Sequence, residues 1–336
     1  MKILITGASG FIGSFLVEHA LEQGYDTWAA VRRTSSRKYL RDSRTHFIEL
    51  DLGDDDTLHA QLEAHTAEHG AFDAVIHAAG ATKCLRAEDF FAVNAEGTRR
   101  LAEQLTVTGA LRKDGRFVFI SSLSVWGPVH EKDRQAICDD DTPRPNTAYG
   151  NSKLLAESYL AQTQGLNYVV LRPTGVYGPR ERDYFIMARS IARHIDFAAG
   201  FRPQVLTFIY VRDLVQAAFL ALTRGKRGAG YFLSDGGLYS SRTFSDLLQA
   251  ELGVKRVLHF TAPLWLLHTV CYVSGKTAKA AGKASTLNMD KYRIMCQRNW
   301  RCDISPACRD LGYRPQWPLP RGVQEAVAWY RKEGWL

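Results

Sequence analysis

Tyr149 and Lys153, two residues of complementary chemistry, lie four positions apart in the sequence. On an α-helix, residues at this spacing share a face, so both side chains would serve one site. A tyrosine hydroxyl has an ordinary pKa of about 10 and is a poor base at neutral pH, but a nearby ammonium group favours the phenolate. The pair therefore predicts a general acid/base, with Tyr149 exchanging a proton and Lys153 lowering its pKa. The same spacing also occurs by chance on exposed helices, so this prediction depends on the surrounding sequence.

A serine-rich segment supplies part of that context. Residues 119–127 read FISSLSVWG, which is typical of an apolar strand that ends in small hydroxyl side chains. Ligands bind at the carboxyl ends of strands in parallel sheets. A serine such as Ser122 at such an end would hydrogen-bond a substrate carbonyl or alkoxide and orient it towards Tyr149. A plain serine-rich turn is the alternative interpretation.

A glycine-rich loop opens the chain, with a GxxGxxG pattern formed by Gly7, Gly10 and Gly13 between an expected strand and an expected helix. Glycines allow a tight turn and a close approach of the backbone to a pyrophosphate, and the helix N-terminus offers unpaired N–H groups to phosphate oxygens. The pattern therefore predicts a dinucleotide site. Its expected residues are Gly7, Ser9, Gly10, Phe11, Ile12 and Gly13.

The end of the second expected strand indicates which dinucleotide binds. An NAD site usually has an Asp or Glu there that accepts hydrogen bonds from the ribose 2′-hydroxyl, but this chain has Val31, followed by Arg32 and Arg33. A guanidinium group pairs with a 2′-phosphate, which a carboxylate would repel. We therefore expect NADP rather than NAD, although solvated surface arginines are the alternative. Asp51 and Leu52, after the third strand, are expected beside the adenine, or Asp51 is simply a helix cap.

Short apolar runs alternate with longer amphipathic ones in the first half of the chain, which predicts a doubly wound parallel sheet of the α/β class. The pattern fades after Arg172. A dinucleotide-binding domain is expected over 1–172 plus about 207–235, and a smaller, mainly helical C-terminal substrate domain over about 173–206 plus 236–336. The strands are expected at 3–6, 27–31, 46–50, 74–77, 117–121 and 168–171, and the helices at 11–23, 57–69, 90–108 and 149–164, with a further strand–helix unit at 207–222.

The 336 residues carry a net charge of +8, with 46% hydrophobic and 23% charged residues. Lys and Arg are scattered and no recognition motif accompanies them, which argues against nucleic acid as a partner. The six cysteines lack the paired spacing of metal ligands, so no metal is expected and buried free thiols are preferred. The chain opens directly on the first strand, with no room for a signal peptide, so the expected location is the cytoplasm.

The longest apolar stretch, residues 262–273, is shorter than a membrane-spanning helix, which needs about 20 residues. We expect a helix that covers the core or a pocket. The alternative is association with a membrane surface, because Lys276, Lys279 and Lys283 follow this stretch.

Taken together, these motifs resemble the extended short-chain dehydrogenase/reductase family, which has the Rossmann fold, over essentially the whole chain. The resemblance is nearest to its 3β-hydroxysteroid dehydrogenase and dihydroflavonol reductase branch. It rests on the order and spacing of the glycine loop, His77-Ala78-Ala79-Gly80, Asn94, Ser122, Tyr149 and Lys153, residues 171–179 (LRPTGVYGP), residues 208–213 (FIYVRD) and the C-terminal Trp300-Arg301-Cys302-Asp303.

The resemblance implies roles for individual residues. Ser122 corresponds to the catalytic hydroxyl, Tyr149 to the proton donor or acceptor, Lys153 to its activator and nicotinamide-ribose ligand, and Asn94 to a support for the catalytic site. The same resemblance implies that Ala78, Ala79, Gly80, Pro173 and Val176 line the cofactor. Substrate contacts are expected from Lys83, Ser124, Trp126, Thr174 and Tyr184. Members of the family often dimerise through the helix that carries the tyrosine, which implies a homodimer.

Two branches of the family compete as functions. Dehydratases have Asp-Glu directly after the catalytic hydroxyl, whereas this chain has Leu123 and Ser124, which cannot transfer protons. The leading hypothesis is an NADP(H)-dependent oxidoreductase that reduces a ketone, or oxidises a secondary alcohol, on a small apolar or sterol-like molecule. The first alternative is a nucleotide-sugar epimerase or reductase using NAD(P), with its diphosphate held by Arg180, Arg182, Arg189 and Arg193. A non-catalytic dinucleotide sensor is the second, disfavoured because Ser122, Tyr149 and Lys153 are all present.

Overall fold

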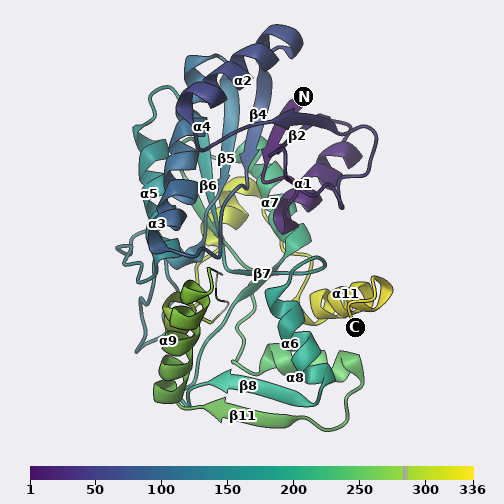
Figure 1. Cartoon of the computed structure of the whole chain (residues 1–336), viewed down its shortest axis with the longest axis vertical. Helices are drawn as coiled ribbons and strands as arrows, with labels where there is room; N and C mark the ends of the chain where they lie inside the picture. The colour runs from purple at the N-terminus through teal and green to yellow at the C-terminus, as the bar shows by residue number, and fades with distance from the viewer. Residues whose placement is uncertain (283–284, 286) are drawn as a thin grey trace.

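The computed structural model describes residues 1–282, 285 and 287–336. Its main feature is a parallel sheet of seven strands in the order β10-β6-β5-β4-β1-β2-β3 (Figure 1). The order reverses direction beside β1, which creates a crevice at the carboxyl ends of the strands. The seven strands are β1 (Lys2–Thr6), β2 (Asp26–Val31), β3 (His46–Glu49), β4 (Phe72–His77), β5 (Leu111–Ile120), β6 (Tyr168–Pro173) and β10 (Gly230–Leu233).

Helices cover both faces of this sheet, as the alternation in the sequence predicts. The strands are apolar on both faces because successive side chains point to opposite sides; Ile3 and Ile5 face one helical layer and Leu4 faces the other. One layer consists of α1 (Phe11–Glu22) and α7 (Val211–Arg224). The other consists of α2 (Asp55–His69), α4 (Gly97–Val107) and α5 (Ala148–Gln162).

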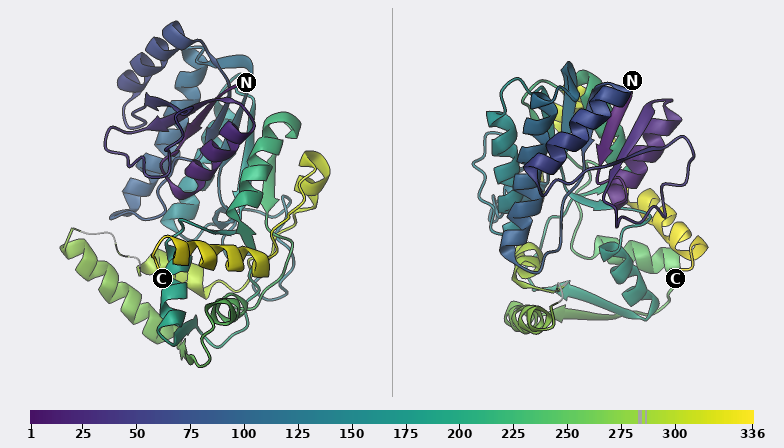
Figure 2. Two further views of the ribbon diagram at one scale, coloured as in Figure 1. Left: turned by 90° about the vertical axis from the view of Figure 1, so that its right-hand side faces the viewer. Right: turned by 45° about the horizontal axis from the view of Figure 1, so that its top comes forward.

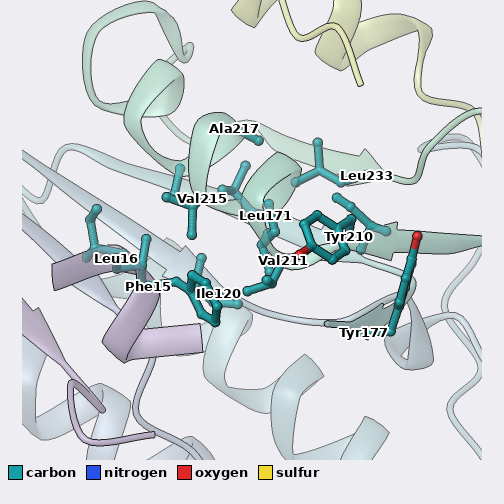
Figure 3. Packing of buried hydrophobic residues seen from close by; sticks show 14 of the residues in the cluster. Phe15, Leu16, Ile120, Leu171, Tyr177, Tyr210, Val211, Val215, Ala217 and Leu233 are labelled. Carbon is teal, nitrogen blue, oxygen red and sulfur yellow. The ribbon is translucent and has the colours of Figure 1, made fainter. Parts of the chain in front are cut away.

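The larger core continues from the sheet into the C-terminal half of the chain. Figure 3 shows Phe15 and Leu16 of α1 close to Ile120 of β5, with Val211 of α7 between the sheet and the buried ring of Tyr177. Tyr177 and Tyr210 are both fully buried. A single apolar core therefore joins the sheet to the segments below it and holds the two parts in a fixed arrangement.

The segments below the sheet include two small parallel sheets as well as helices (Figures 1 and 2). β7 (Gly175–Tyr177) pairs with β9 (Phe208–Tyr210), and β8 (Ile195–Ala199) pairs with β11 (Leu258–Ala262). The helical elements are α6 (Asp183–Ala192), α8 (Thr243–Leu252), α9 (Leu264–Ala280), α10 (Met289–Cys296), η3 (Ala307–Leu311) and α11 (Leu319–Lys332). The strand–helix unit expected at 207–222 corresponds to β9 and α7. β9 lies outside the main sheet, and the later strand β10 pairs with β6 at its edge. The proposed division into two domains stays a prediction.

The helix predicted at 90–108 is a composite of three elements. It begins earlier, as α3 (Ala87–Phe90), passes through a π-helical segment, η1 (Phe91–Glu96), and continues as α4. Periodicity does not reveal the π-helical segment because one extra residue in a turn barely changes the apolar pattern. Such segments are frequent at functional sites, and this one contains Asn94.

The apolar stretch at 262–273 forms the end of β11 and the first half of α9, but it is not a cover for the core. Six apolar side chains of α9, including Trp265 and Val273, are exposed, and of the cysteines only Cys271 and Cys302 are buried. Within the described part of the chain, no helix is long and apolar enough to cross a membrane. Lys283, one of the lysines that motivated the membrane-surface alternative, lies outside the described residues.

Candidate active site

A cleft of about 1360 Å³ lies at the carboxyl ends of β1, β2, β4, β5 and β6, between the sheet and the elements below it. This is the position at which ligands bind in open α/β sheets. The volume exceeds that of a pocket for one small ligand, and it is enough for a dinucleotide and a second molecule. Both the glycine loop and the Tyr149–Lys153 pair line this one cleft.

The glycine loop fits a pyrophosphate because its main chain lies bare at the cleft. Gly7 has a φ of +66°, and a Cβ on Gly13 would lie 2.0 Å from the Gly7 carbonyl oxygen, so neither position accepts a side chain without movement. α1 begins directly after Gly10 and has no side-chain cap. Its first N–H groups therefore remain available for phosphate oxygens. Gly7, Ser9, Gly10, Phe11, Ile12 and Gly13 all line the cleft, as predicted.

The end of β4 forms the second wall of the cofactor region. His77 is buried, contacts the Thr6 hydroxyl at 2.6 Å through Nδ1 and the Thr98 hydroxyl at 2.9 Å through Nε2, and burial lowers its pKa to about 3. Uncharged His77 thus ties β4 to β1 and α4. Ala78, Ala79 and Gly80 follow and line the cleft. A Cβ on Gly80 would come within 3.1 Å of Lys153 Nζ, so only glycine leaves this space free.

Tyr149, Lys153 and Ser122 converge at the centre of the cleft. α5 is capped by the Thr147 hydroxyl, which accepts a hydrogen bond from Gly150 N at 3.0 Å. A Cβ on Gly150 would lie 2.5 Å from the Ser124 carbonyl oxygen, so the glycine allows α5 to pack closely against the serine segment. This close packing places Ser122 near enough to Tyr149 to lower the pKa of its hydroxyl.

The protonation of the pair differs from the sequence-based expectation. Burial raises the pKa of Tyr149, and the hydrogen bond with Ser122 lowers it by less. Burial also lowers the pKa of Lys153 to about 8, while the negative charge of Glu157 raises it. The ammonium donates to the Ile120 carbonyl oxygen at 3.0 Å. Burial therefore favours the protonated hydroxyl of Tyr149, whereas the sequence predicted that Lys153 would lower its pKa.

Asn94 lies outside the cleft lining and holds its wall together. It is completely buried; its Oδ1 accepts from Ala81 N at 2.7 Å, and its Nδ2 donates to Ala81 O and to Ser152 Oγ, each at 3.0 Å. Asn94 therefore joins the segment after β4 to α5, one residue before Lys153. The structure assigns it a positioning role rather than contact with a reacting group.

At the other end of the cleft, Arg32 lines the surface directly after β2 and is exposed, whereas Arg33 is exposed but does not line the cleft. Asp51 and Leu52 line it as well. The Asp51 carboxylate accepts a hydrogen bond from Gly53 N at 2.8 Å, so it stabilises a turn in addition to facing the expected adenine region. Arg100, which the motifs do not reveal, also lines this end and donates to Asp55 at 3.0 Å.

The predicted substrate residues divide into two groups. Thr174 and Tyr184 line the cleft, as do Pro173 and Val176, whereas Lys83, Ser124 and Trp126 do not. Trp126 is only 3% exposed; Arg172 stacks on its ring at 4.5 Å, and its indole N–H donates to the Asp141 carbonyl oxygen. Lys83 instead forms an ion pair with Asp183. Motif similarity could not predict that Arg172 would cover Trp126 or that Asp183 would pair with Lys83, because these partners come from distant segments.

The substrate end contains residues that no motif indicates. It combines apolar side chains with carboxylates that already form hydrogen bonds or ion pairs within the protein. Glu181 accepts hydrogen bonds from the N–H groups of Asp183 at 2.8 Å and Tyr184 at 2.6 Å, and so caps α6. Asp183 lies 3.5 Å from Lys291. The additional lining residues at this end include Val93, Glu181, Asp183, Ile186, Met187, Ser190, Ile195, Asp196, Phe197, Lys291 and Met295.

The four arginines considered for a diphosphate lie elsewhere. Arg180 donates to Ser14 Oγ at 2.9 Å and to Glu18 at 2.5 Å, and it stacks between the rings of Phe15 and Tyr39. Arg182, Arg189 and Arg193 are exposed. Among the described residues that line the cleft, none of the four is present.

Comparison with known proteins agrees with this geometry. Residues 3–232 match the model of the NAD dependent epimerase/dehydratase family. A putative dihydroflavonol 4-reductase of Synechocystis is 29% identical, over 99% of this chain and 95% of that protein. A dTDP-glucose 4,6-dehydratase of Actinoplanes is 27% identical, over 98% of each.

Solved structures show the same fold. The UDP-glucose 4-epimerase of Thermotoga maritima superimposes with a TM-score of 0.77 at 23% identity and covers 99% of both chains. The sheet, its helical layers and the C-terminal elements therefore form a known fold. The chain is a member of the NAD-dependent epimerase/dehydratase family, within the extended short-chain dehydrogenases/reductases, and an NAD(P)-dependent enzyme that acts on CH–OH groups.

Proposed function

We propose that this enzyme uses NADPH to reduce a ketone, reversibly, on a small apolar or sterol-like molecule. The observation that carries the proposal is the contrast between the two ends of the cleft. A cation, Arg32, lines the end where the adenosine ribose would lie, and the opposite end is lined by apolar side chains and by carboxylates that are already hydrogen-bonded or ion-paired.

The preference for NADPH is supported by residues 31–35. Val31 is buried where an NAD-binding site would have a carboxylate, and its apolar side chain cannot accept hydrogen bonds from a 2′-hydroxyl. Arg32 is exposed at the cleft, and its backbone N–H is held by Ser35 Oγ at 3.0 Å. A guanidinium group at this point would pair with a 2′-phosphate.

The apolar substrate is supported by the walls of the opposite end. Ile186, Met187, Ile195, Phe197 and Met295 supply a surface that is stabilised by contact with hydrocarbon. A sugar diphosphate would need cations, and the arginines expected to provide them are exposed or engaged elsewhere. Lys291 lies in the cleft but faces Asp183 at 3.5 Å.

The catalytic residues suit reduction. The bound nicotinamide supplies a hydride from its C4. Ser122 would hydrogen-bond the substrate carbonyl, and Tyr149, protonated because burial raises its pKa, would donate its proton to the developing alkoxide. Lys153 would then help to restore the proton on Tyr149, since it is buried beside the nicotinamide region and has a pKa of about 8.

Titration of the protein with NADPH and NADH tests the cofactor preference. Arg32→Ala should weaken NADPH binding about tenfold or more, by loss of a charge-assisted pairing, and leave NADH binding nearly unchanged. Arg33→Ala is the matched control, because Arg33 is equally exposed but does not line the cleft.

A panel of substrates tests the reaction. We expect NADPH oxidation with steroid-like or other apolar ketones, and none with UDP-sugars. Turnover of a UDP-sugar by enzyme carrying tightly bound NAD, with no consumption of NADPH, would contradict the proposal and favour the nucleotide-sugar alternative.

A further inference from the structure

The end of the molecule farthest from the main sheet exposes an unusual amount of apolar surface. β8, β11 and α9 lie together at this end (Figures 1 and 2). We call this surface the apolar end. Its exposed large apolar side chains, each at least 36% accessible, are Phe197, Phe201, Leu258, Phe260, Leu264, Trp265, Leu266, Val270, Tyr272 and Val273.

α9 contributes most of this surface because it packs along only one narrow stripe. Its less exposed positions, 267, 271, 274, 275 and 278, follow helical spacing, and the helix packs against α10. Apart from the exposed polar residues His268 and Thr269, the rest of its first three turns is apolar but exposed, with Trp265 at 71%. A helix that is apolar on nearly all sides is normally buried in protein or lipid. In an isolated molecule, the exposed face of α9 therefore leaves apolar surface in contact with water.

The two strands extend this surface to the mouth of the cleft. Phe197 of β8 stacks on Phe260 of β11, with ring centroids 5.7 Å apart, and both rings are exposed. Phe197 also lines the substrate end of the cleft. Gly200, at the end of β8, accommodates Leu264 at the start of α9, so strands and helix form one continuous apolar face that reaches the cleft.

The charges of the segment that contributes most of this face are of one sign, whereas the carboxylates of neighbouring elements, Asp246 and Asp290, are ion-paired with Arg242 and Arg293. The sequence from 252 to 289 contains no Asp or Glu. Lys255 and Arg256 precede β11, and three lysines, at 276, 279 and 283, follow the start of α9. Lys276, Lys255 and Arg256 are exposed. The nearest carboxylate in β8, Asp196, is 4% exposed and faces His259 Nδ1 and the Ser245 hydroxyl, each at 3.1 Å.

We infer that the apolar end docks on a membrane surface that contains anionic phospholipids. Apolar and aromatic side chains, Trp and Tyr among them, insert at the level of the lipid headgroups, and flanking lysines and arginines pair with anionic headgroups. A second copy of the chain fits less well, because a symmetric contact would bring two basic rims of the same sign together. Docking in this orientation places the mouth of the cleft, at Phe197, against the lipid.

Vesicle co-sedimentation tests the contribution of the apolar side chains. Vesicles of equal parts phosphatidylglycerol and phosphatidylcholine should bind the full-length protein, and vesicles of phosphatidylcholine alone should bind it less. Trp265→Ser should reduce binding to the mixed vesicles about tenfold, by loss of buried apolar area. Val107→Ser is the matched control, because Val107 is 72% exposed at the end of α4, at the opposite edge of the sheet.

A charge reversal tests the basic rim. Lys276→Glu should lower binding to the mixed vesicles at least about fivefold and leave binding to phosphatidylcholine unchanged. Lys113→Glu makes the same charge change at an exposed position near the start of β5, far from the apolar end, and should have little effect. Added salt should weaken the binding of the wild type.

Two results would overturn the inference. One is that the wild type does not bind the mixed vesicles, or that Trp265→Ser binds them as well as the wild type does. The other is a dimer in sedimentation velocity that Trp265→Ser dissociates, which would make this face a self-association surface. Circular dichroism and thermal unfolding verify that each variant is folded. Because vesicle binding requires no turnover, it succeeds or fails independently of the proposed reductase activity.

Discussion

The two ends of the cleft are constructed from different parts of the chain. At the cofactor end the lining is largely main chain: the loop between β1 and α1, where glycines at 7 and 13 leave no room for a Cβ, and the segment after β4, where a Cβ on Gly80 would fit only tightly. At the substrate end the lining consists of side chains from α6, β8 and α10, such as Met187, Phe197 and Met295.

This difference determines how each end responds to change. A main-chain surface recognises groups that every dinucleotide has, and one added methyl group disrupts it. A side-chain surface is adjustable, since one apolar residue replaces another at modest cost. Tyr149 and Lys153 lie between the two ends, where the main-chain surface meets the side-chain surface. Four variants test this contrast, and they are given in order of decreasing expected effect.

Tyr149→Phe should have the largest effect. It removes the proton donor and keeps the ring, so turnover should fall by about a thousandfold or more. NADPH affinity, measured by titration, should remain nearly that of the wild type because the glycine loop is untouched. Unchanged turnover would show that another group supplies the proton.

Gly13→Ala should weaken cofactor binding by at least about tenfold, because the new Cβ would lie 2.0 Å from the Gly7 carbonyl oxygen and displace the loop. Gly97→Ala is the control: that helical glycine has only ordinary contacts, the nearest at 3.6 Å. If both variants bind NADPH as the wild type does, the cofactor end is not the close-fitting main-chain surface described above.

Met295→Ala should affect only the substrate end. Loss of part of an apolar wall should lower kcat/KM for an apolar ketone by about threefold to tenfold, with NADPH affinity unchanged. Met289→Ala, on the same helix but outside the cleft lining, should leave both quantities unchanged. An equal effect of the two substitutions would mean that α10 acts through stability rather than contact.

Glu157→Gln should shift the pH profile by a smaller amount. Wild-type turnover should decline as the pH rises through about 8, where Lys153 loses its proton. The Glu157 carboxylate raises the pKa of Lys153, so its removal should move this decline to lower pH. Glu157 and Asp139 both accept from the Arg172 guanidinium at 2.8 Å. Asp139→Asn is therefore the matched control and should leave the pH profile in place.

The positions of the cofactor loop and catalytic residues could be predicted because local sequence dictates them. Alternating apolar runs correctly indicated six of the strands, with boundaries shifted by a few residues, and the glycine loop lies as expected. β5 begins at Leu111, earlier than expected, because its bulged start lacks a continuous apolar run. The π-helical segment around Asn94 and the pairing of β9 with β7 were not predictable, since both depend on contacts between distant segments.

Sequence patterns did not predict which side chains are accessible at the substrate end of the cleft. Trp126 and Lys83 looked available for a ligand, but Arg172 covers one and Asp183 pairs with the other. The Tyr149 pKa also follows burial rather than the neighbouring Lys153.

The sequence alone was enough to predict the parallel sheet, the position of the glycine loop and the placement of Ser122, Tyr149 and Lys153 in one cleft, because these depend on short-range spacing, glycine geometry and the period of apolar residues. Only the tertiary structure decided which side chains line the substrate end, which charges are neutralised and that α9 lies exposed beside the cleft mouth. Those properties arise from burial and long-range contacts, which no local pattern encodes.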